Sequence, residues 1–447
     1  MTDQTSVDVV AKAMDDVPFG SFHWRVMSLI IAGLFFDLFD VSVLGSLAPD
    51  LIGSGFAAPA EVAVIASATF FGLLIGSVSQ GELTDRFGRK VVYQANLLIY
   101  GIATIAAASA PNYLTLTGLR FIAGIGLGAE IPLAYAYAAE FSPRKSRGSV
   151  MAVLNLLGGT LPFPLAVLFS LAFREVIGWR GIFVIIGLGA LIVFVLRISL
   201  PESPRWLVAN KRAAEAFDIL KRIGLSVERP RDEPVRAEAT RHDPLWDVLR
   251  NHTRRVLVVM VSLFAAFAAL YGLVTWLPTL MGAQGFNIVK SLKFTLVMTC
   301  AFPISSLILI LFVDRIGRIA MTVGSFVLAG VSAMIFRSVT DESSILIVGF
   351  FMSFFVINAA NTIEILCGEL FPTNTRSSGS GLGFGAGRLG AMLASYFVPV
   401  IVTLYGTGGV YVAIAIVLAI GAVSILLLGI EPAKLALEEI APTERKE

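Results

Sequence analysis

Twelve apolar runs recur along this chain, and each is about long enough to cross a hydrocarbon layer of roughly 30 Å as a helix. Charged residues make up only 15% of the chain and hydrophobic residues 56%, whereas about a quarter of the residues in a soluble globular protein are charged. The sequence therefore predicts an all-α membrane protein with twelve transmembrane helices. We place them at residues 26–48, 60–80, 91–110, 113–139, 149–173, 180–200, 256–280, 291–313, 319–338, 344–368, 379–404 and 409–430.

The basic residues indicate which side of the membrane each loop occupies. If both termini are cytoplasmic, most of the 34 lysines and arginines fall on the inner side, and two, Arg120 and Arg388, lie inside spans. Such an excess of basic residues in inner loops fixes the orientation of multi-span proteins. Since these residues are spread over several loops, no nucleic-acid partner is expected. Five basic residues fall on the outer side: Arg174, Arg180, Lys290, Lys293 and Arg337.

The loops repeat at one offset. The loop "GELTDRFGRK" at 81–90 aligns with "FVDRIGRIA" at 312–320, and "EFSPRKSRG" at 140–148 aligns with "ELFPTNTRS" at 369–377, both after a shift of 229 positions. The chain is therefore predicted to contain two parallel six-helix halves, residues 1–200 and 256–447, joined by a polar linker at 201–255. Parallel repeats of this kind place the ligand site near the membrane midplane, where the halves meet.

The first of these loops matches the full G-x-L-x-D-R-x-G-R-K signature, and the chain therefore resembles the major facilitator superfamily over essentially its whole length. In such a loop Asp85 can accept hydrogen bonds from a helix N-terminus and a basic side chain, and Gly88 permits a tight turn. We expect the Asp85 and Asp314 loops to lock the outward-facing state. The predicted gating set is Asp85, Arg86, Gly88, Arg89, Glu140, Arg147, Asp314, Arg315, Arg318, Glu369 and Arg376.

Charges inside the spans are not duplicated between the halves. Asp37 and Asp40 share one helix face because they are three residues apart, and at about 1.5 Å per residue they lie at the same depth as Arg120. Two acids for one base leave one carboxyl group without a cation, and burial favours its protonated form. We expect these residues to couple transport to protons; the alternative is a fixed ionic clamp.

Two further charges leave alternatives open. Glu130 has apolar neighbours in its span, and it either lines the cavity, where it binds substrate or proton, or bonds to a neighbouring backbone. Arg388 lies about 15 Å from the inner face by helix rise. Its guanidinium suits a carboxylate ligand, unless an internal acid such as Glu364 or Asp37 neutralises it.

Several spans also present aromatic and amide groups. Such a lining suits a flat, modestly apolar organic molecule. The substrate-binding candidates, besides Arg388, are Tyr135, Asn155, Tyr271, Trp276, Asn358, Asn361 and Tyr396.

The segment "PESPRWL" at 201–207 resembles the signature after span 6 in sugar porters and in organic-ion and metabolite:proton symporters. The D-x-x-D pair in the first span, Glu140, and Arg376 with Arg388 resemble the aromatic acid:proton symporter family and its nicotinate-transporter relatives. This resemblance implies that Asp37 and Asp40 are coupling residues and that Arg388 anchors an anion. Leu38 stands where that family usually has glycine, so the approach of the substrate to this helix differs from the family pattern.

The sequence thus predicts a monomeric, proton-coupled importer of a small organic anion, an aromatic or heteroaromatic carboxylate, in a bacterial inner membrane. It retains its first span, because the first 25 residues lack the features of a signal peptide. No enzyme activity, cofactor or metal site is expected. The alternatives are a carrier of an organic cation or neutral metabolite, and a membrane sensor without transport.

Within the linker, "AAEAFDILKRIG" predicts an amphipathic cytoplasmic helix.

Overall fold

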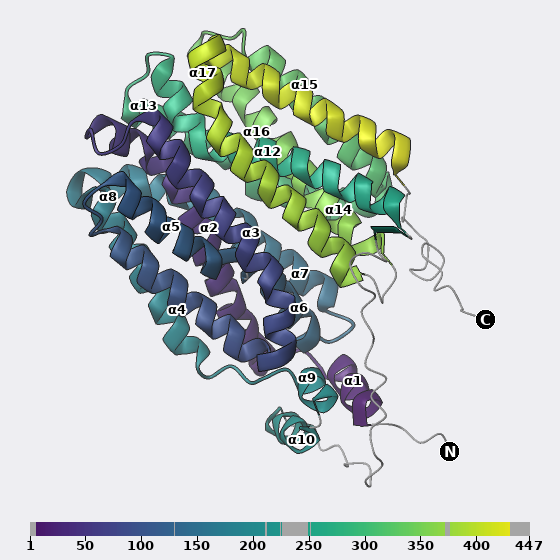
Figure 1. Ribbon diagram of the computed structural model, residues 1–447. Helices are drawn as coiled ribbons and strands as arrows, with labels where there is room; N and C mark the ends of the chain where they lie inside the picture. Colours follow the sequence, from purple (N-terminus) through teal and green to yellow (C-terminus); the bar gives the residue numbers. More distant parts are fainter. Residues whose placement is uncertain are drawn as a thin grey trace.

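In a computed structural model, the chain folds into helices that run side by side in two bundles (Figure 1). The structure describes residues 6–128, 130–210, 212–223, 225, 249–250, 252–371 and 376–429. Within these ranges, helices are the only regular secondary structure. The predicted all-α fold is therefore confirmed.

The first half begins with a short helix and then carries the first six spans. Its helices are α1 (Ser6–Asp16), α2 (Ser21–Gly53), α3 (Pro59–Phe87), α4 (Arg89–Ala107), α5 (Tyr113–Gly128), α6 (Glu130–Phe141), α7 (Arg147–Leu154), the π-helix η1 (Asn155–Thr160) and α8 (Pro162–Arg197). Two short helices follow, α9 (Pro204–Ala209) and α10 (Ala213–Arg222). The amphipathic helix predicted in the linker is confirmed as α10, whereas residues 226–248 lie outside the described part.

The second half carries the other six spans. They are α12 (Thr253–Ala283), α13 (Ile288–Thr299), α14 (Ala301–Ile316), α15 (Arg318–Phe336), α16 (Glu342–Glu369) and α17 (Arg376–Leu428).

The twelve predicted spans correspond to ten long apolar segments, because two segments each cross twice. Residues 147–197 form one of them and residues 379–428 the other. Each folds back at a glycine with a positive φ, Gly178 at 65° and Gly406 at 69°. Side chains with a β-carbon rarely adopt this conformation, so these glycines form the tight connections between spans 5 and 6 and between spans 11 and 12.

The backbone confirms the internal repeat. Gly88 and Gly317, 229 positions apart, have nearly the same dihedral angles, φ 90° and ψ 157° against φ 94° and ψ 152°. Each glycine ends one long helix and begins the next. The two signature loops are thus copies of one turn, as the alignment of their sequences predicts.

The halves contact one another away from these turns. The Ser67 hydroxyl of α3 donates a hydrogen bond of 3.1 Å to the Met392 carbonyl of α17, and these two helices lie side by side in Figure 1. The rings of Phe163 and Phe302 meet edge to face at 5.0 Å. Helices α1, α9 and α10 gather at one end of the bundles (Figure 1). This end carries the basic loops, and we call it the predicted cytoplasmic end.

Candidate functional site

The deepest ion pair joins α2 to α5. Both guanidinium ends of Arg120 bind the Asp40 carboxylate, with Nη1 to Oδ1 at 3.0 Å and Nη2 to Oδ2 at 2.5 Å. Neither side chain has any exposed surface. Phe183 covers the guanidinium, its ring centre 5.4 Å from Cζ. The predicted pairing across the first and fourth spans is therefore confirmed for Asp40.

Asp37 lies one helical turn earlier and has no such partner. It is 1% exposed, and within the described part of the chain neither of its carboxyl oxygens has a hydrogen-bond partner. The charged groups that act on it electrostatically are Glu130, Arg388, Asp40 and Arg197. The predicted excess carboxyl group is thus Asp37, and it lies between the buried charges of the two halves.

Glu130 pairs with a side chain of its own half rather than with a backbone group, and it is not among the residues that line the central cavity. Its Oε1 lies 2.7 Å from Nη2 of Arg197 in α8, and both side chains are buried. Arg197 also donates to the Leu29 carbonyl at 2.9 Å and to the Tyr93 hydroxyl at 2.9 Å. The charge distribution in the sequence assigned Arg197 to the inner loops, and this was wrong because its side chain turns back into the bundle. A buried ion pair therefore ties the sixth span to the first, third and fourth.

A central cavity lies between the halves. Its walls come from α2, α6, η1 and α8 on one side and from α12, α16 and α17 on the other. The lining residues are Leu34, Leu38, Ile131, Tyr135, Asn155, Gly159, Phe163, Phe267, Leu270, Tyr271, Ile357, Ala360, Asn361, Glu364 and Phe384.

The internal repeat determines which positions line this cavity. Four pairs of lining residues are separated by the repeat offset of 229: Leu38 with Phe267, Ile131 with Ala360, Tyr135 with Glu364, and Asn155 with Phe384. Gly159, another lining residue, corresponds to Arg388 in the same way. Equivalent backbone positions therefore form both walls, and the chemical difference between the walls comes from their side chains.

Arg388, on α17, contacts two of the lining residues, Phe267 and Tyr271, but is not itself one of them. It is 3% exposed, and its Cζ lies 5.6 Å and 5.9 Å from the ring centres of Phe267 and Tyr271. Its hydrogen bond to the Tyr271 hydroxyl is long, at 3.5 Å. Among the described residues no acidic side chain lies within ion-pair distance of it. The predicted internal neutralisation by Glu364 or Asp37 is therefore absent from this part of the structure.

Three predicted substrate contacts lie elsewhere. Tyr396 is 47% exposed on the outer surface of the bundle. The Trp276 indole donates to the Ser395 carbonyl at 3.0 Å. The Asn358 amide accepts from the Ser325 hydroxyl and donates to the Ser305 hydroxyl, both at 3.0 Å. Trp276 and Asn358 therefore connect helices within the second half, and none of the three is among the residues that line the cavity.

The fifth span contains a feature that the sequence did not indicate. Asn155–Thr160 is a π-helix inserted between α7 and α8, and such insertions often occur at functional sites. It brings Asn155 and Gly159 to the cavity. The Asn155 amide donates to the Tyr135 hydroxyl at 3.2 Å, which leaves the phenolic hydrogen of Tyr135 available to a ligand.

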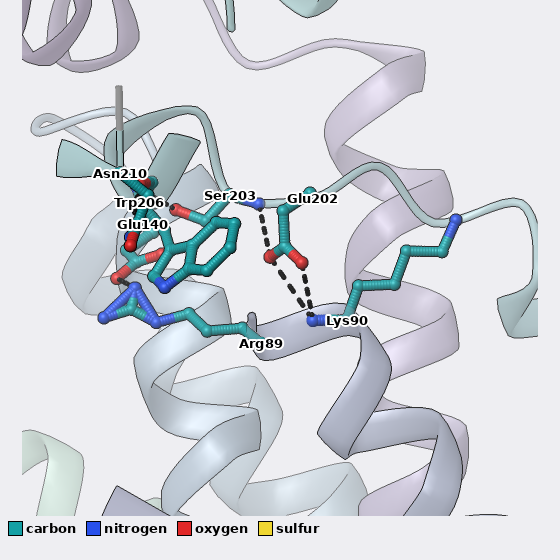
Figure 2. Close-up of polar contacts among 7 residues, drawn as sticks. All are labelled: Arg89, Lys90, Glu140, Glu202, Ser203, Trp206 and Asn210. Atoms are coloured by element: carbon teal, nitrogen blue, oxygen red, sulfur yellow. Dashed lines mark hydrogen bonds and ion pairs between the residues drawn. The ribbon is translucent and has the colours of Figure 1, made fainter. Parts of the chain in front are cut away.

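The predicted gating residues gather at the predicted cytoplasmic end. Arg89, directly after the Gly88 turn, forms an ion pair with Glu140 of α6 (Figure 2). The equivalent pair in the second half is Arg318 with Glu369, bound through two contacts of 3.0 Å and 3.1 Å. Each signature loop is thus fastened to the end of the span two helices further along the chain.

Glu202, in the "PESP" segment, holds the start of α4. Its carboxylate accepts from the Lys90 backbone N–H at 3.2 Å and from the Ser203 backbone N–H at 2.9 Å (Figure 2). A carboxylate at a helix N-terminus satisfies free N–H groups and opposes the positive end of the helix dipole. This is the role that the sequence predicted for Asp85, whose side chain lies outside the described part, as do those of Asp314 and Arg376.

Helix α1 adds another contact at this end. Asp15 accepts from Arg147 at 2.5 Å and from Arg205 at 2.9 Å. Arg147 was predicted to act in gating, and it is thereby connected to both the N-terminal helix and the segment after the sixth span. Arg86 and Arg315 are exposed.

Comparisons with known proteins agree with this architecture. The family described as "Sugar (and other) transporter" matches residues 53–443. The chain is 31% identical to the niacin transporter NiaP of Acinetobacter baylyi, over 97% of this chain and 100% of that protein. It is 27% identical to the 4-hydroxybenzoate transporter PcaK of the same species, over 88% of each chain.

Among solved structures, the proton:xylose symporter XylE of the major facilitator superfamily has the same fold, with a TM-score of 0.72 at 19% identity. The match covers 94% of this chain and 98% of that one. The resemblance inferred from the loops is thereby confirmed. The chain belongs to the sugar (and other) transporter family of the major facilitator superfamily, and it is a multi-pass membrane transporter rather than an enzyme.

Proposed function

We propose that this protein imports an aromatic or heteroaromatic carboxylate together with protons. The observation that carries the proposal is the contrast between Asp40, fully paired with Arg120, and Asp37, which is buried and has no hydrogen-bond partner among the described residues. The names of two relatives support the substrate class, since one transports niacin and the other 4-hydroxybenzoate.

The substrate would bind where the halves meet. Arg388 has no acidic partner in the described part of the structure, and its two terminal nitrogens can hold both oxygens of a carboxylate. Phe267, Tyr271 and Phe384 supply aromatic faces close to it. An aromatic acid therefore suits this site in both its charge and its flat apolar body.

The proton would bind to Asp37. A carboxylate in a low-dielectric region is costly unless it is paired, so an unpartnered one favours its neutral form. Arg388 is one of the charges that act on Asp37. Substrate that neutralises Arg388 would therefore strengthen the preference of Asp37 for a proton, and this links the two bound species.

The halves 1–200 and 256–447 would rock about this site as two bodies joined by residues 201–255. The Arg89 and Arg318 ion pairs would keep each signature loop attached to its own half during this motion, and the loops would close the cytoplasmic side. We place the protein as a monomer in a bacterial inner membrane with both termini in the cytoplasm.

The test is uptake of radiolabelled nicotinate and 4-hydroxybenzoate into proteoliposomes that hold the purified protein. An imposed pH gradient, acid outside, should drive accumulation above equilibrium, and a protonophore should abolish it. Arg388→Ala should remove binding of both acids. Accumulation that does not depend on the pH gradient would contradict proton coupling. Uptake of organic amines but not of acids would contradict the substrate class.

A further inference from the structure

Glu364 is an acidic side chain that the transport mechanism proposed above does not use. It lies on α16 and lines the central cavity, and its side chain is half-buried. Within the described part of the chain it has no hydrogen bond and no ion pair. Its counterpart in the internal repeat, Tyr135, lines the opposite wall. The cavity thus contains a carboxyl group that no described residue holds by a hydrogen bond or an ion pair.

Arg388 and Glu364 lie at different depths. Glu364 is five residues before Glu369, about 7.5 Å from the end of its helix, whereas Arg388 is twelve residues after the start of α17, about 18 Å from that end. Along the bundle axis they are therefore roughly 10 Å apart, with Arg388 deeper in the membrane. Glu364 lines the central cavity directly, and Arg388 contacts the lining residues Phe267 and Tyr271.

The other polar groups near Glu364 do not neutralise it. The Tyr135 and Tyr271 hydroxyls are within its electrostatic range, as is Cys367 on its own helix. Arg388 is the one charge that acts appreciably on it among the described residues. Asp37, in the first half, also acts on Tyr271. A ligand held by Arg388 would consequently have its far edge close to Glu364.

We propose that Glu364 is a second recognition group, which selects aromatic acids with a hydrogen-bond donor on the ring, away from the carboxylate. This inference rests on the proposed function. A hydroxyl or amino group on the ring donates to Glu364 while the ligand carboxylate binds Arg388. A ligand without such a donor displaces water from Glu364 and leaves its carboxylate unpaired. Sites built to hydrogen-bond a ligand hydroxyl discriminate strongly against analogues that lack it.

The experiment measures binding of benzoate and 4-hydroxybenzoate to the purified full-length protein by isothermal titration calorimetry. The wild type should bind 4-hydroxybenzoate about tenfold more tightly than benzoate, as expected for one additional hydrogen bond inside the protein. Glu364→Leu should reduce this ratio of the two affinities to below about threefold, chiefly by weakening the binding of 4-hydroxybenzoate. Glu364→Gln keeps a neutral hydrogen-bond acceptor and should give an intermediate affinity ratio. This variant therefore tests the proposal if the leucine variant does not fold.

The matched control is Glu342→Gln, the same change on the first turn of the same helix, where the side chain is 58% exposed and pairs with Lys290. It should leave the ratio unchanged. A wild-type ratio near one, or a ratio that both Glu364 variants retain, would overturn the role of Glu364 while the aromatic-acid proposal stands. Failure of the wild type to bind either acid would overturn both.

Discussion

Asp37 and Asp40 are one turn apart on α2, and the structure predicts opposite consequences for the same substitution at each. Asp40→Asn removes the negative charge that the two terminal nitrogens of Arg120 bind at 3.0 Å and 2.5 Å. Neither side chain of this ion pair is exposed. Loss of one partner from a buried ion pair costs about 3–5 kcal/mol, because the other charge stays buried without compensation. For a half of this size that corresponds to a fall in melting temperature of roughly 6–20 °C.

Asp37→Asn breaks no contact in the described part of the structure, since neither carboxyl oxygen has a partner. A neutral amide is cheaper to bury than a carboxylate. It also removes a potential charge near Asp40 and Glu130. The free energy of unfolding should therefore change by less than about 1 kcal/mol. The proton that Asp37 would carry is lost, so accumulation driven by a pH gradient should fall to the level of protein-free vesicles.

Both substitutions are assayed on the same detergent-purified protein. Thermal unfolding measures the stability difference, and proteoliposome uptake with and without a pH gradient measures coupling. Binding of 4-hydroxybenzoate to Asp37→Asn confirms that the protein remains folded and able to take its ligand. Equal destabilisation by the two substitutions, or pH-driven accumulation by Asp37→Asn, would refute the assignment of a clamp to Asp40 and a proton to Asp37.

Two glycine substitutions test the packing around this cluster. A β-carbon at Gly33 would lie 1.7 Å from Arg197 Nη2, so Gly33→Ala should displace the buried ion pair and cost about 3 kcal/mol or more in thermal unfolding. Across the interface, a β-carbon at Gly45 would lie 2.3 Å from the Val274 carbonyl oxygen. Gly45→Ala should hold the halves apart there and lower uptake by about tenfold, with a smaller effect on stability. Gly118→Ala, with no neighbour within 4 Å, is the control for both, and an equal effect there would contradict the packing argument.

The architecture was predictable from the sequence because its determinants are local or repeated. Apolar runs of sufficient length require helices in lipid, and one offset relates the Gly88 and Gly317 turns. The pairing of Asp40 with Arg120 followed from depth alone, since helix rise places both at one level. Such inferences need only distance along a helix, and that can be read from residue numbers.

The features that the sequence did not predict depend on the rotation of each helix about its axis and on local irregularities in the helices. Arg197 lies near the end of its span, where a long side chain can turn to the membrane surface or back into the bundle, and the sequence does not distinguish these directions. Tyr396 was placed on the cavity from its span, but the helix turns it outward. The π-helix at 155–160 shifts the register of the lining residues. A search for lining positions at the repeat offset would have singled out Glu364 once Tyr135 was a candidate.

The asymmetry between the halves has a mechanistic consequence. Among the described residues, the first half holds the buried Asp40 and Glu130 ion pairs and the unpaired Asp37. The second half provides Glu364 at the cavity and Arg388 next to the lining residues Phe267 and Tyr271. Proton and ligand would therefore bind to different halves, and coupling requires an interaction across the interface. The electrostatic effect of Arg388 on Asp37 is such an interaction, and at an effective dielectric of about 20 it weakens in inverse proportion to distance. Separation of the halves would therefore uncouple proton from ligand, so the cavity must stay closed around both while the transporter reorients.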